Sequence, residues 1–550
     1  MLRVRWIGRV DYREVLALQT ALFEYGQEQH LLLLEHPHVF TYGPRSDLGK
    51  NLRCDPAEVG ADFVSVKRGG DITYHGPGQL VGYPILNIEN TIGAKFHVRS
   101  VEQLIIDTLT ELGVKNVGRL PGFAGVWLDA DNERCRKISA VGVRLARGRT
   151  MHGFALNVEP DMTYMRQHIV PCGVSEYPVT SLKEEGIDVS MRDVVEIISR
   201  LATERWGGGE ADLQEVAWVF RPEDLSRFSR GEGPGEPVRM LARLSDAGVD
   251  GGVGLSERKP EWLRPRLQIG AEVLEIKRTL SDLRLVTVCQ EAGCPNLSEC
   301  WRDGTATFMV LGERCTRACG FCLVDTRKPG PPDADEPRRV AEAVASMRLT
   351  HAVVTMVARD DLTDGGFAHV AKCVRAIRKR NPLTRVETLV SDAKGDAVSL
   401  DLLFSARPDV FNHNVETVAR LQRAVRPSAG YARSLGVLAR AKSEGLVVKS
   451  GLVLGMGETA KEVDGCLADL AGIGVDIVTI GQYLRPTTNH TPVARWIHPD
   501  EFSRWKQVGE SLGIGHVESS PLTRSSYHAG QSADALSEAV PVTLSKVVKS

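Results

Sequence analysis

The 550-residue sequence lacks long apolar segments and an excess of charge of either sign. The longest conspicuous apolar run near the start, residues 31–34, is far shorter than the ~20 residues of a membrane-spanning helix. No apolar core of signal-peptide length follows residues 1–6. The 68 Lys and Arg residues nearly balance the 70 Asp and Glu residues, so no strong field favours nucleic acid or a membrane surface. We therefore expect a cytoplasmic protein that binds neither nucleic acid nor membrane.

The composition excludes two further classes. Hydrophobic residues make up 42% of the chain, which is ordinary for a folded protein and excludes disordered and fibrous classes.

Cysteine is scarce outside one segment: of eleven cysteines, three precede position 289, six lie in 289–322 and two follow. In a reducing compartment such a group favours metal binding over disulfides.

One segment is devoid of apolar residues. Residues 229–237 hold three glycines and two prolines, which is typical of a flexible linker. A second glycine-rich stretch occupies 250–254. A length of 550 residues also predicts more than one domain. We assign an N-terminal domain to 1–232, a connecting segment to 233–257 and a C-terminal domain to 258–550.

The second half alternates candidate strands with helical patterns. The six candidate strands are 307–311, 351–357, 385–390, 409–412, 447–454 and 476–480. Such repeats predict an α/β fold with a parallel sheet, either open or curled into a partial barrel. Functional residues should then collect at the carboxyl ends of the strands.

Three cysteines directly follow the first of these strands. Cys315, Cys319 and Cys322 can hold three irons of a 4Fe–4S cube and leave the fourth iron open, whereas their spacing suits zinc poorly. This loop resembles the radical S-adenosylmethionine superfamily. The resemblance implies that S-adenosylmethionine binds the open iron and is cleaved to a 5′-deoxyadenosyl radical after one-electron reduction.

A second triplet lies upstream, at Cys289, Cys294 and Cys300. Together with the runs at 304–312, 359–366, 386–389, 410–414, 449–459 and 481–484, it resembles the lipoyl synthase family over roughly 258–530. The resemblance implies a partial (β/α)6 TIM-type barrel and a second, auxiliary 4Fe–4S cluster on this triplet. Ser526, in the run 524–527, is its implied fourth ligand. An alkoxide binds iron less softly than a thiolate, so it can leave when the cluster gives up sulfide.

Three residues are candidates for cofactor binding. Glu387, near a strand end, could accept hydrogen bonds from ribose hydroxyls. Gly451 and Gly455 would let an adenine ring approach bare backbone. All three are also ordinary features of strands.

The N-terminal half contains a glycine-rich stretch at 68–79 that lacks the ending of a P-loop. With Lys137 at the start of a strand and Cys172 in a Pro-Cys-Gly loop, it resembles lipoyl(octanoyl) transferase over about 5–225, a member of the lipoate/biotin ligase-like α/β family. The resemblance implies that Cys172 becomes acylated, that Lys137 is its acid and base, and that His75 is an active-site histidine. His36 is a weaker pocket candidate. The implied substrate-binding residues are Arg68, Gly69, Gly70, Tyr74, His75, Gly76, Ser139, Ala140, Val141, Gly142, His152, Gly153, Phe154 and Ala155.

The chemistry of a thiol supports this interpretation. A free thiol with a pKa of about 8.5 is only slightly ionised at neutral pH, and a neighbouring ammonium favours the thiolate. Attack on a thioester gives another thioester, so the transfer needs no ATP. Cys135, two residues from Lys137, is the rival nucleophile. Cys54, Cys373 and Cys466 receive no role, and the last two are expected in the core.

The two resemblances together imply a bifunctional enzyme of protein lipoylation. Its first half would transfer octanoyl from acyl carrier protein, through Cys172, to a lysine of a lipoyl domain in a 2-oxoacid dehydrogenase complex or of the glycine cleavage H protein. Its second half would insert two sulfurs, at C6 and C8, with ferredoxin or flavodoxin as electron donor. The alternative is an ATP-dependent lipoate ligase-like domain fused to an iron–sulfur electron carrier or redox regulator.

Overall fold

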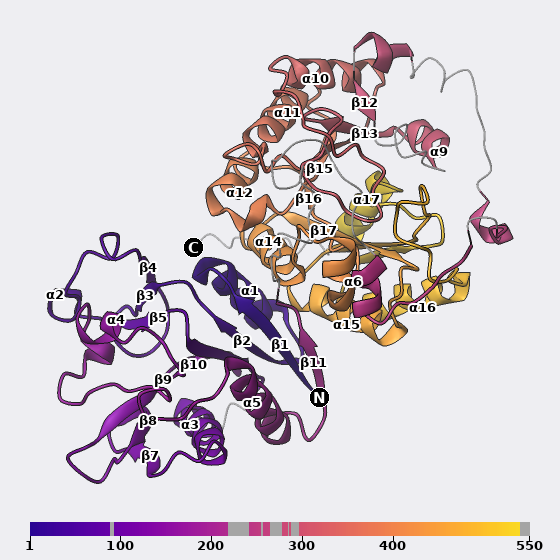
Figure 1. Ribbon diagram of the computed structural model, residues 1–550. Coiled ribbons are helices and arrows are strands. Elements are labelled where there is room, and N and C mark those ends of the chain that lie inside the picture. The colour runs from indigo at the N-terminus through magenta and orange to yellow at the C-terminus, as the bar shows by residue number, and fades with distance from the viewer. Residues whose placement is uncertain are drawn as a thin grey trace, which may run out of the picture. The chain divides into compact units, whose positions relative to one another are not determined.

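The chain forms two compact units, Met1–Val219 and Phe220–Ser550, in a computed structural model (Figure 1). The structure describes residues 1–88, 93–217, 241–254, 257–264, 278–283, 285–287 and 296–539. The predicted domain boundary at 232 and the run 229–237 lie outside the described residues.

The N-terminal unit is built on an eight-stranded mixed sheet in the order β11-β1-β2-β6-β10-β9-β8-β7, beside a small sheet β4-β3-β5. The strands are β1 Leu2–Arg9, β2 Gln29–Glu35, β3 Val39–Tyr42, β4 Asp62–Ser65, β5 Thr73–His75, β6 Gln79–Ile85, β7 Val117–Leu120, β8 Phe123–Leu128, β9 Arg136–Ala146, β10 Arg149–Asn157 and β11 Ala211–Glu215. The helices are α1 Tyr12–Tyr25, α2 Leu48–Asn51, α3 Ala94–Glu111, α4 Thr163–Arg166 and α5 Met191–Trp206.

Side-chain caps fix where the helices begin. Asp11 accepts a hydrogen bond from the Arg13 amide and so satisfies one free N–H at the start of α1. Ser190 and Asp193 form a capping box at the start of α5. These polar caps precede apolar residues at helical spacing, which is why each helix buries one face.

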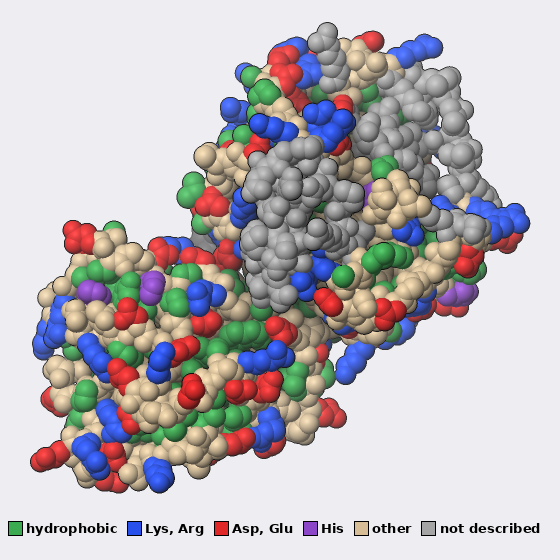
Figure 2. Space-filling view, viewed as in Figure 1, with side chains coloured by type: hydrophobic (Ala, Val, Ile, Leu, Met, Phe, Trp, Pro, Cys, Tyr) green, Lys and Arg blue, Asp and Glu red, His purple; other side chains and the backbone are tan. Residues whose placement is uncertain are grey.

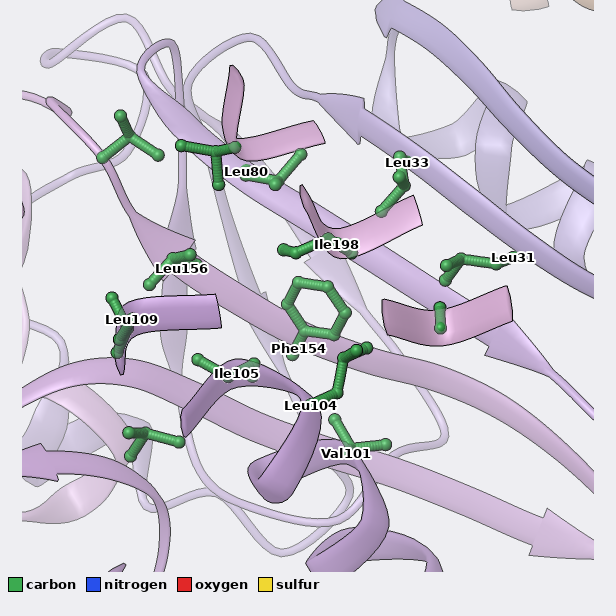
Figure 3. Packing of buried hydrophobic residues seen from close by; sticks show 14 of the residues in the cluster. Leu31, Leu33, Leu80, Val101, Leu104, Ile105, Leu109, Phe154, Leu156 and Ile198 are labelled. Atoms are coloured by element: carbon green, nitrogen blue, oxygen red, sulfur yellow. The ribbon is translucent and has the colours of Figure 1, made fainter. Parts of the chain in front are cut away.

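The core of this unit lies between the large sheet and the helices α3 and α5 (Figure 3). Along β2, Leu31 and Leu33 point into this core, while Leu32 and Leu34 point to the other face by strand alternation and are equally buried. The other labelled members of the cluster are Leu80, Val101, Leu104, Ile105, Leu109, Phe154, Leu156 and Ile198.

The C-terminal unit contains seven parallel strands, β13 to β19, that pair in chain order, and a short antiparallel strand β12 beside β13. The strands are β12 Val286–Thr287, β13 Thr305–Val310, β14 His351–Met356, β15 Arg385–Leu389, β16 Val410–Asn412, β17 Val447–Leu454, β18 Ile477–Gln482 and β19 His516–Ser519. The helices are α6 Leu241–Asp246, α9 Leu297–Arg302, α10 Glu336–Ser346, α11 Phe367–Arg380, α12 Ala397–Phe404, α13 Gln422–Val425, α14 Tyr431–Ser443, α15 Ala460–Gly472, α16 Pro499–Ser511 and α17 Ala529–Ala539.

The α/β class and the parallel sheet are confirmed, with all six predicted strands in place. No pairing joins β19 to β12 within the described ranges, so the sheet is a partial barrel. The sequence missed β12, which has two residues, and β19, a half-buried strand that contains His516, Glu518 and Ser519. Neither carries the apolar run on which the strand predictions were based.

Part of the predicted connecting segment is folded. Residues 241–254 carry α6 and pack on the C-terminal unit, where the Val253 amide donates to the Val493 carbonyl at 2.7 Å. Leu244 is 2% exposed, and Val249 occupies the space beside Gly457. The glycines of 250–254 suggested flexibility, but the apolar residues beside them provide a packing face.

On the face that Figure 2 shows, charge of one sign dominates the surface of neither unit. Lys and Arg side chains are interspersed there with Asp and Glu. Among the helices that the structure describes, none is long and apolar enough to cross a membrane.

The buried face of α3 predicts the first measurable effect. We expect Leu104→Ala, at a side chain that is 0% exposed, to lower the free energy of unfolding of the N-terminal unit by about 2–5 kcal/mol because it leaves a cavity. Phe96→Ala, in the same helix but 63% exposed, is the matched control and should change it by less than about 0.5 kcal/mol. Urea denaturation of the full chain measures both, and equal losses would contradict the assigned packing.

Candidate active sites

Cys172 lies in a short turn, Pro171–Gly173, with its backbone in the left-handed region at φ 57°. A non-glycine residue rarely adopts this conformation unless its surroundings hold it there. The Cys172 amide donates to the Ile72 carbonyl at 2.8 Å, and the Gly173 amide donates to the Val170 carbonyl at 3.0 Å. The turn is therefore tied to the strand β5 region, and the thiol has a fixed position.

Lys137, on β9, reaches this thiol. Its Nζ donates to Cys172 Sγ at 3.6 Å and also lies 5.1 Å from the centre of the Trp127 ring. Gly125 makes room for it, since a Cβ there would lie 2.7 Å from Lys137 Cε. No carboxylate in the described part of the chain forms an ion pair with Lys137. The structure thus brings together the two residues that the sequence predicts as catalytic.

Both residues line a cavity of about 210 Å³. The predicted substrate-binding residues that line it with them are Arg68, Gly69, Gly70, His75, Ala140, Val141, Gly142, His152, Gly153, Phe154 and Ala155. Tyr74, Gly76 and Ser139 are not among the lining residues. The Tyr74 hydroxyl is hydrogen-bonded to His38 Nδ1 at 2.8 Å, and the Ser139 hydroxyl donates to the Ala155 carbonyl at 2.9 Å.

The sequence missed several residues that complete this cavity: Tyr12, Thr73, Tyr83, Gly122, Phe123, Ala124 and Val174. Tyr12 comes from α1, and its ring is stacked on that of His75 with centroids 5.9 Å apart. Nothing in the local sequence marks a tyrosine at a helix start as a pocket residue, because its proximity to His75 depends on how α1 packs.

The aromatic wall of the cavity is uncharged at neutral pH. Burial raises the pKa of Tyr12 to about 12 and lowers the pKa of His152 to about 3. Burial also lowers the pKa of His75 well below its usual value. The weaker candidate His36 lies behind this wall, where its Nδ1 donates to the Val10 carbonyl and its Nε2 accepts from the Tyr83 hydroxyl at 2.9 Å. These neutral side chains favour contact with an acyl chain over contact with a charged group.

The rival cysteines are less suited to attack. Cys135 is 3% exposed, and burial raises the pKa of its thiol. Burial likewise raises the pKa of Cys54, and the nearby Asp55 adds to the effect. Cys373 and Cys466 are buried in the C-terminal unit.

In the C-terminal unit, Cys315, Cys319 and Cys322 lie on the loop after β13, at the carboxyl end of the sheet as the fold class predicts. Backbone hydrogen bonds fix this loop: the Cys315 amide donates to the Asp325 carbonyl at 2.8 Å and the Gly320 amide to the Val425 carbonyl at 2.7 Å. Burial, with a smaller contribution from the nearby Cys319, raises the pKa of Cys315 to about 11.

These three thiols fit an iron–sulfur cube. In the part of the chain that the structure describes, no three His, Cys, Asp or Glu side chains converge on one metal-ion position. A 4Fe–4S cube places its thiolates on separate irons, and three cysteines on one loop could supply three of them. The Arg317 amide donates to Cys315 Sγ at 3.4 Å, and such a hydrogen bond would stabilise a ligand thiolate.

A second cavity, of about 260 Å³, lies inside the barrel. It is lined by Cys300 from α9, by Ser526 from the C-terminal run, by Gly451 and by Phe321 of the cysteine loop. The Asn296 side chain donates to the Leu522 carbonyl at 2.7 Å and so ties α9 to that run. Cys300 and Ser526 therefore face one cavity, while Cys289 and Cys294 lie outside the described residues.

The three predicted cofactor residues differ in position. Gly451 lines the barrel cavity, whereas a Cβ at Gly455 would meet Gln482 Nε2 at 2.2 Å, so the chain itself makes the close approach there. Glu387 is 0% exposed and does not line the cavity. The sequence did not single out Glu416, which does line it.

Glu387 is engaged by its neighbours on the sheet. Its carboxylate lies 3.1 Å from Lys449 Nζ and accepts from Asn412 Nδ2 at 2.9 Å, with His351 Nε2 at 3.3 Å. Burial alone would raise the pKa of Glu387, but Lys449, His351 and Asn412 together outweigh it and hold the pKa at about 2. The ribose-binding role stays a prediction, and the contacts point to a structural ion pair.

The surroundings of the three cysteines of the N-terminal unit predict their order of alkylation. We expect iodoacetamide to modify Cys172 before Cys54 and Cys135, because only Cys172 has an ammonium beside its sulfur. Lys137→Met should slow the reaction at Cys172 and leave the other two unchanged. Peptide mass spectrometry over time measures this, and faster labelling of Cys135 would favour the rival nucleophile.

The buried ion pair predicts a loss of stability. Glu387→Gln leaves Lys449 without a counter-charge, and we expect the free energy of unfolding of the C-terminal unit to fall by about 3–5 kcal/mol. The double variant Glu387→Gln with Lys449→Met should recover part of this loss. A variant that unfolds like the wild type in urea but binds S-adenosylmethionine poorly would instead support the ribose role.

Two family models match the chain: the lipoyl protein ligase A/B catalytic domain at residues 11–201, and the radical SAM superfamily at residues 309–470. The chain is 54% identical over 275 residues to lipoyl synthase of Mycobacterium ulcerans, which covers 50% of this chain and 85% of that protein. It is 51% identical over 297 residues to lipoyl synthase of Rubrobacter xylanophilus, and this match covers 54% of this chain and 90% of that protein.

Solved structures give weaker likenesses. Lipoate-protein ligase A bound with ATP is 17% identical, with a TM-score of 0.33, and covers 40% of this chain and 89% of its own. Methylornithine synthase is 12% identical, with a TM-score of 0.31, and the match covers 43% of this chain and 73% of that one. Similarity at that level says nothing of shared chemistry. The sequence relatives and the two matched domains are decisive: the chain belongs to the lipoyl synthase family, and it joins a radical S-adenosylmethionine domain of that family to an N-terminal domain of the lipoyl protein ligase A/B type.

Proposed function

We propose that this protein carries out two consecutive steps of protein lipoylation. The N-terminal unit transfers octanoyl from acyl carrier protein to Cys172 and then to a lysine of a lipoyl domain, in a 2-oxoacid dehydrogenase complex or in the glycine cleavage H protein. The C-terminal unit inserts sulfur at C6 and C8 of that chain. The observation that carries the proposal is the 3.6 Å contact of Lys137 Nζ with Cys172 Sγ in a cavity whose Tyr12, His75 and His152 side chains are neutral.

In the first step, Lys137 and Cys172 act as a base and a nucleophile. Lys137 takes the thiol proton, the sulfur attacks the thioester carbonyl, and the leaving thiol of acyl carrier protein receives the proton. One thioester is exchanged for another, so no ATP is consumed. The acceptor lysine then attacks the Cys172 thioester, and the thiol regains its proton.

In the second step, residues of the barrel would hold two iron–sulfur clusters with different roles. Cys315, Cys319 and Cys322 would hold a 4Fe–4S cluster that passes one electron, from ferredoxin or flavodoxin, to S-adenosylmethionine. Cys289, Cys294, Cys300 and Ser526 would hold a second cluster that serves as the sulfur source. The shared cavity of Cys300, Ser526 and Phe321 supports this assignment, because two of the four proposed ligands of the second cluster and a residue of the cysteine loop line it together.

The test uses the full chain, reconstituted with iron and sulfide under anaerobic conditions. Octanoyl acyl carrier protein is added without ATP, and intact-mass spectrometry should show octanoyl on Cys172. Addition of a lipoyl domain, S-adenosylmethionine and dithionite should then give 5′-deoxyadenosine and a doubly sulfurated domain.

Two variants separate the halves. Cys172→Ala should abolish octanoyl transfer, by more than about a hundredfold, but still convert a lipoyl domain that is already octanoylated. Cys315→Ala should transfer octanoyl normally and release no 5′-deoxyadenosine. Transfer that requires ATP or survives Cys172→Ala would favour the lipoate ligase alternative. A protein with intact clusters that yields no 5′-deoxyadenosine would contradict the radical step.

A further inference from the structure

Arg317 lies between the cluster cysteines Cys315 and Cys319 and is 6% exposed. A guanidinium is rarely buried unless carboxylates compensate its charge. Here its Nε and one terminal nitrogen donate to the two oxygens of Asp360, at 2.8 and 2.9 Å. The same side chain also lies 2.7 Å from an oxygen of Asp392.

The partners of Arg317 come from two other loops at the same end of the barrel. Asp360 follows β14, and Asp392 follows β15 and is 0% exposed. Asp392 also faces Arg433 of α14 at 3.8 Å, so two arginines balance two aspartates. The Asp360 amide donates to the Thr316 hydroxyl at 3.0 Å, which adds a neutral link beside the ionic ones. Arg317 therefore ties the cysteine loop to the loops after β14 and β15.

This anchoring fixes a hydrogen bond on a cluster ligand. The Arg317 amide donates to Cys315 Sγ at 3.4 Å, and its direction depends on how the Arg317 residue is held. Hydrogen bonds to cluster sulfurs and nearby charges set the reduction potential of an iron–sulfur cluster. Arg314, on the other side of Cys315, differs: its side chain is 44% exposed and pairs with Asp325 at 3.3 Å.

We propose that Arg317 is a positioning residue that sets the reduction potential of the radical-generating cluster, through its Asp360 and Asp392 anchors and the amide bond to Cys315 Sγ. The proposal rests on the radical function proposed above. Arg317 keeps the amide aimed at the sulfur, which stabilises the extra negative charge of the reduced cluster. It also holds the cysteine loop against the loop 359–366.

The test compares two substitutions that preserve charge in one loop. Arg317→Lys keeps a cation, but a single ammonium cannot hold both carboxylates in the forked geometry. Full-chain protein reconstituted with iron and sulfide is titrated potentiometrically, and the electron paramagnetic resonance signal that responds to S-adenosylmethionine is followed. For Arg317→Lys we expect wild-type iron content, a lower reduction potential and a smaller response to S-adenosylmethionine. Arg314→Lys should match the wild type in all three.

Asp392→Asn provides a second readout with the opposite sign. Asp360 still holds Arg317 in this variant, so loss of a buried negative charge should raise the potential. A purely structural role of Arg317 predicts no shift in the assembled Arg317→Lys protein. If Arg317→Lys loses iron, Thr316→Val decides, because it removes the neutral link to the Asp360 amide without a change of charge and should also lower the potential. Wild-type potentials in the assembled variants, or an equal shift in Arg314→Lys, would overturn the proposal. A wild-type protein without a signal that responds to S-adenosylmethionine would instead contradict the proposed function itself.

Discussion

A charged side chain removed from water must find its partners within the protein, and this constraint organises both sites. Lys137 is 7% exposed, and its ammonium contacts the Cys172 sulfur and the face of Trp127 instead of a carboxylate. Arg317 is compensated by two aspartates from neighbouring loops. The first cation has no carboxylate partner in the described part of the chain, whereas the second is locked in place by two. One cation suits acid–base chemistry, and the other suits the rigid support of a cofactor.

The parallel sheet explains why distant residues meet in the C-terminal unit. Strands that run in the same direction place their carboxyl ends at one edge, so Cys315, Asp360 and Asp392 lie on adjacent loops. The C-terminal run enters the same barrel, where Ser525 accepts from Asn412 at 3.1 Å and donates to Asn414 at 3.1 Å. These bonds hold the neighbouring Ser526 at the cavity that Cys300 also lines. The strand order thus creates a site from residues that no local motif connects.

Local pattern and spacing made some features predictable. The apolar runs of β13 to β18 and the glycine-rich stretch before β6 follow from short stretches of sequence. Other features depend on tertiary packing: Tyr12 reaches the acyl cavity through the placement of α1, and Glu387 meets Lys449, two strands away in the sheet. A carboxylate at a strand end is the same in sequence whether it faces a ribose or a lysine. Likewise, the glycines of 250–254 suggest a flexible connection in the sequence, whereas Leu244 and Val249 beside them pack on the C-terminal unit.

The two sets of cysteines show how surroundings decide the chemistry of one side chain. The thiols of Cys315, Cys319 and Cys322 are crowded, and burial raises their pKa values, so they would be poor nucleophiles without a metal to take the place of their protons. Cys172 lies alone of its kind among the residues that line its cavity, with an ammonium at its sulfur and a half-buried turn in the left-handed region. Because each arrangement disfavours the chemistry of the other, the surroundings support the proposal that one chain carries both an acyl-transfer thiol and cluster-binding thiols.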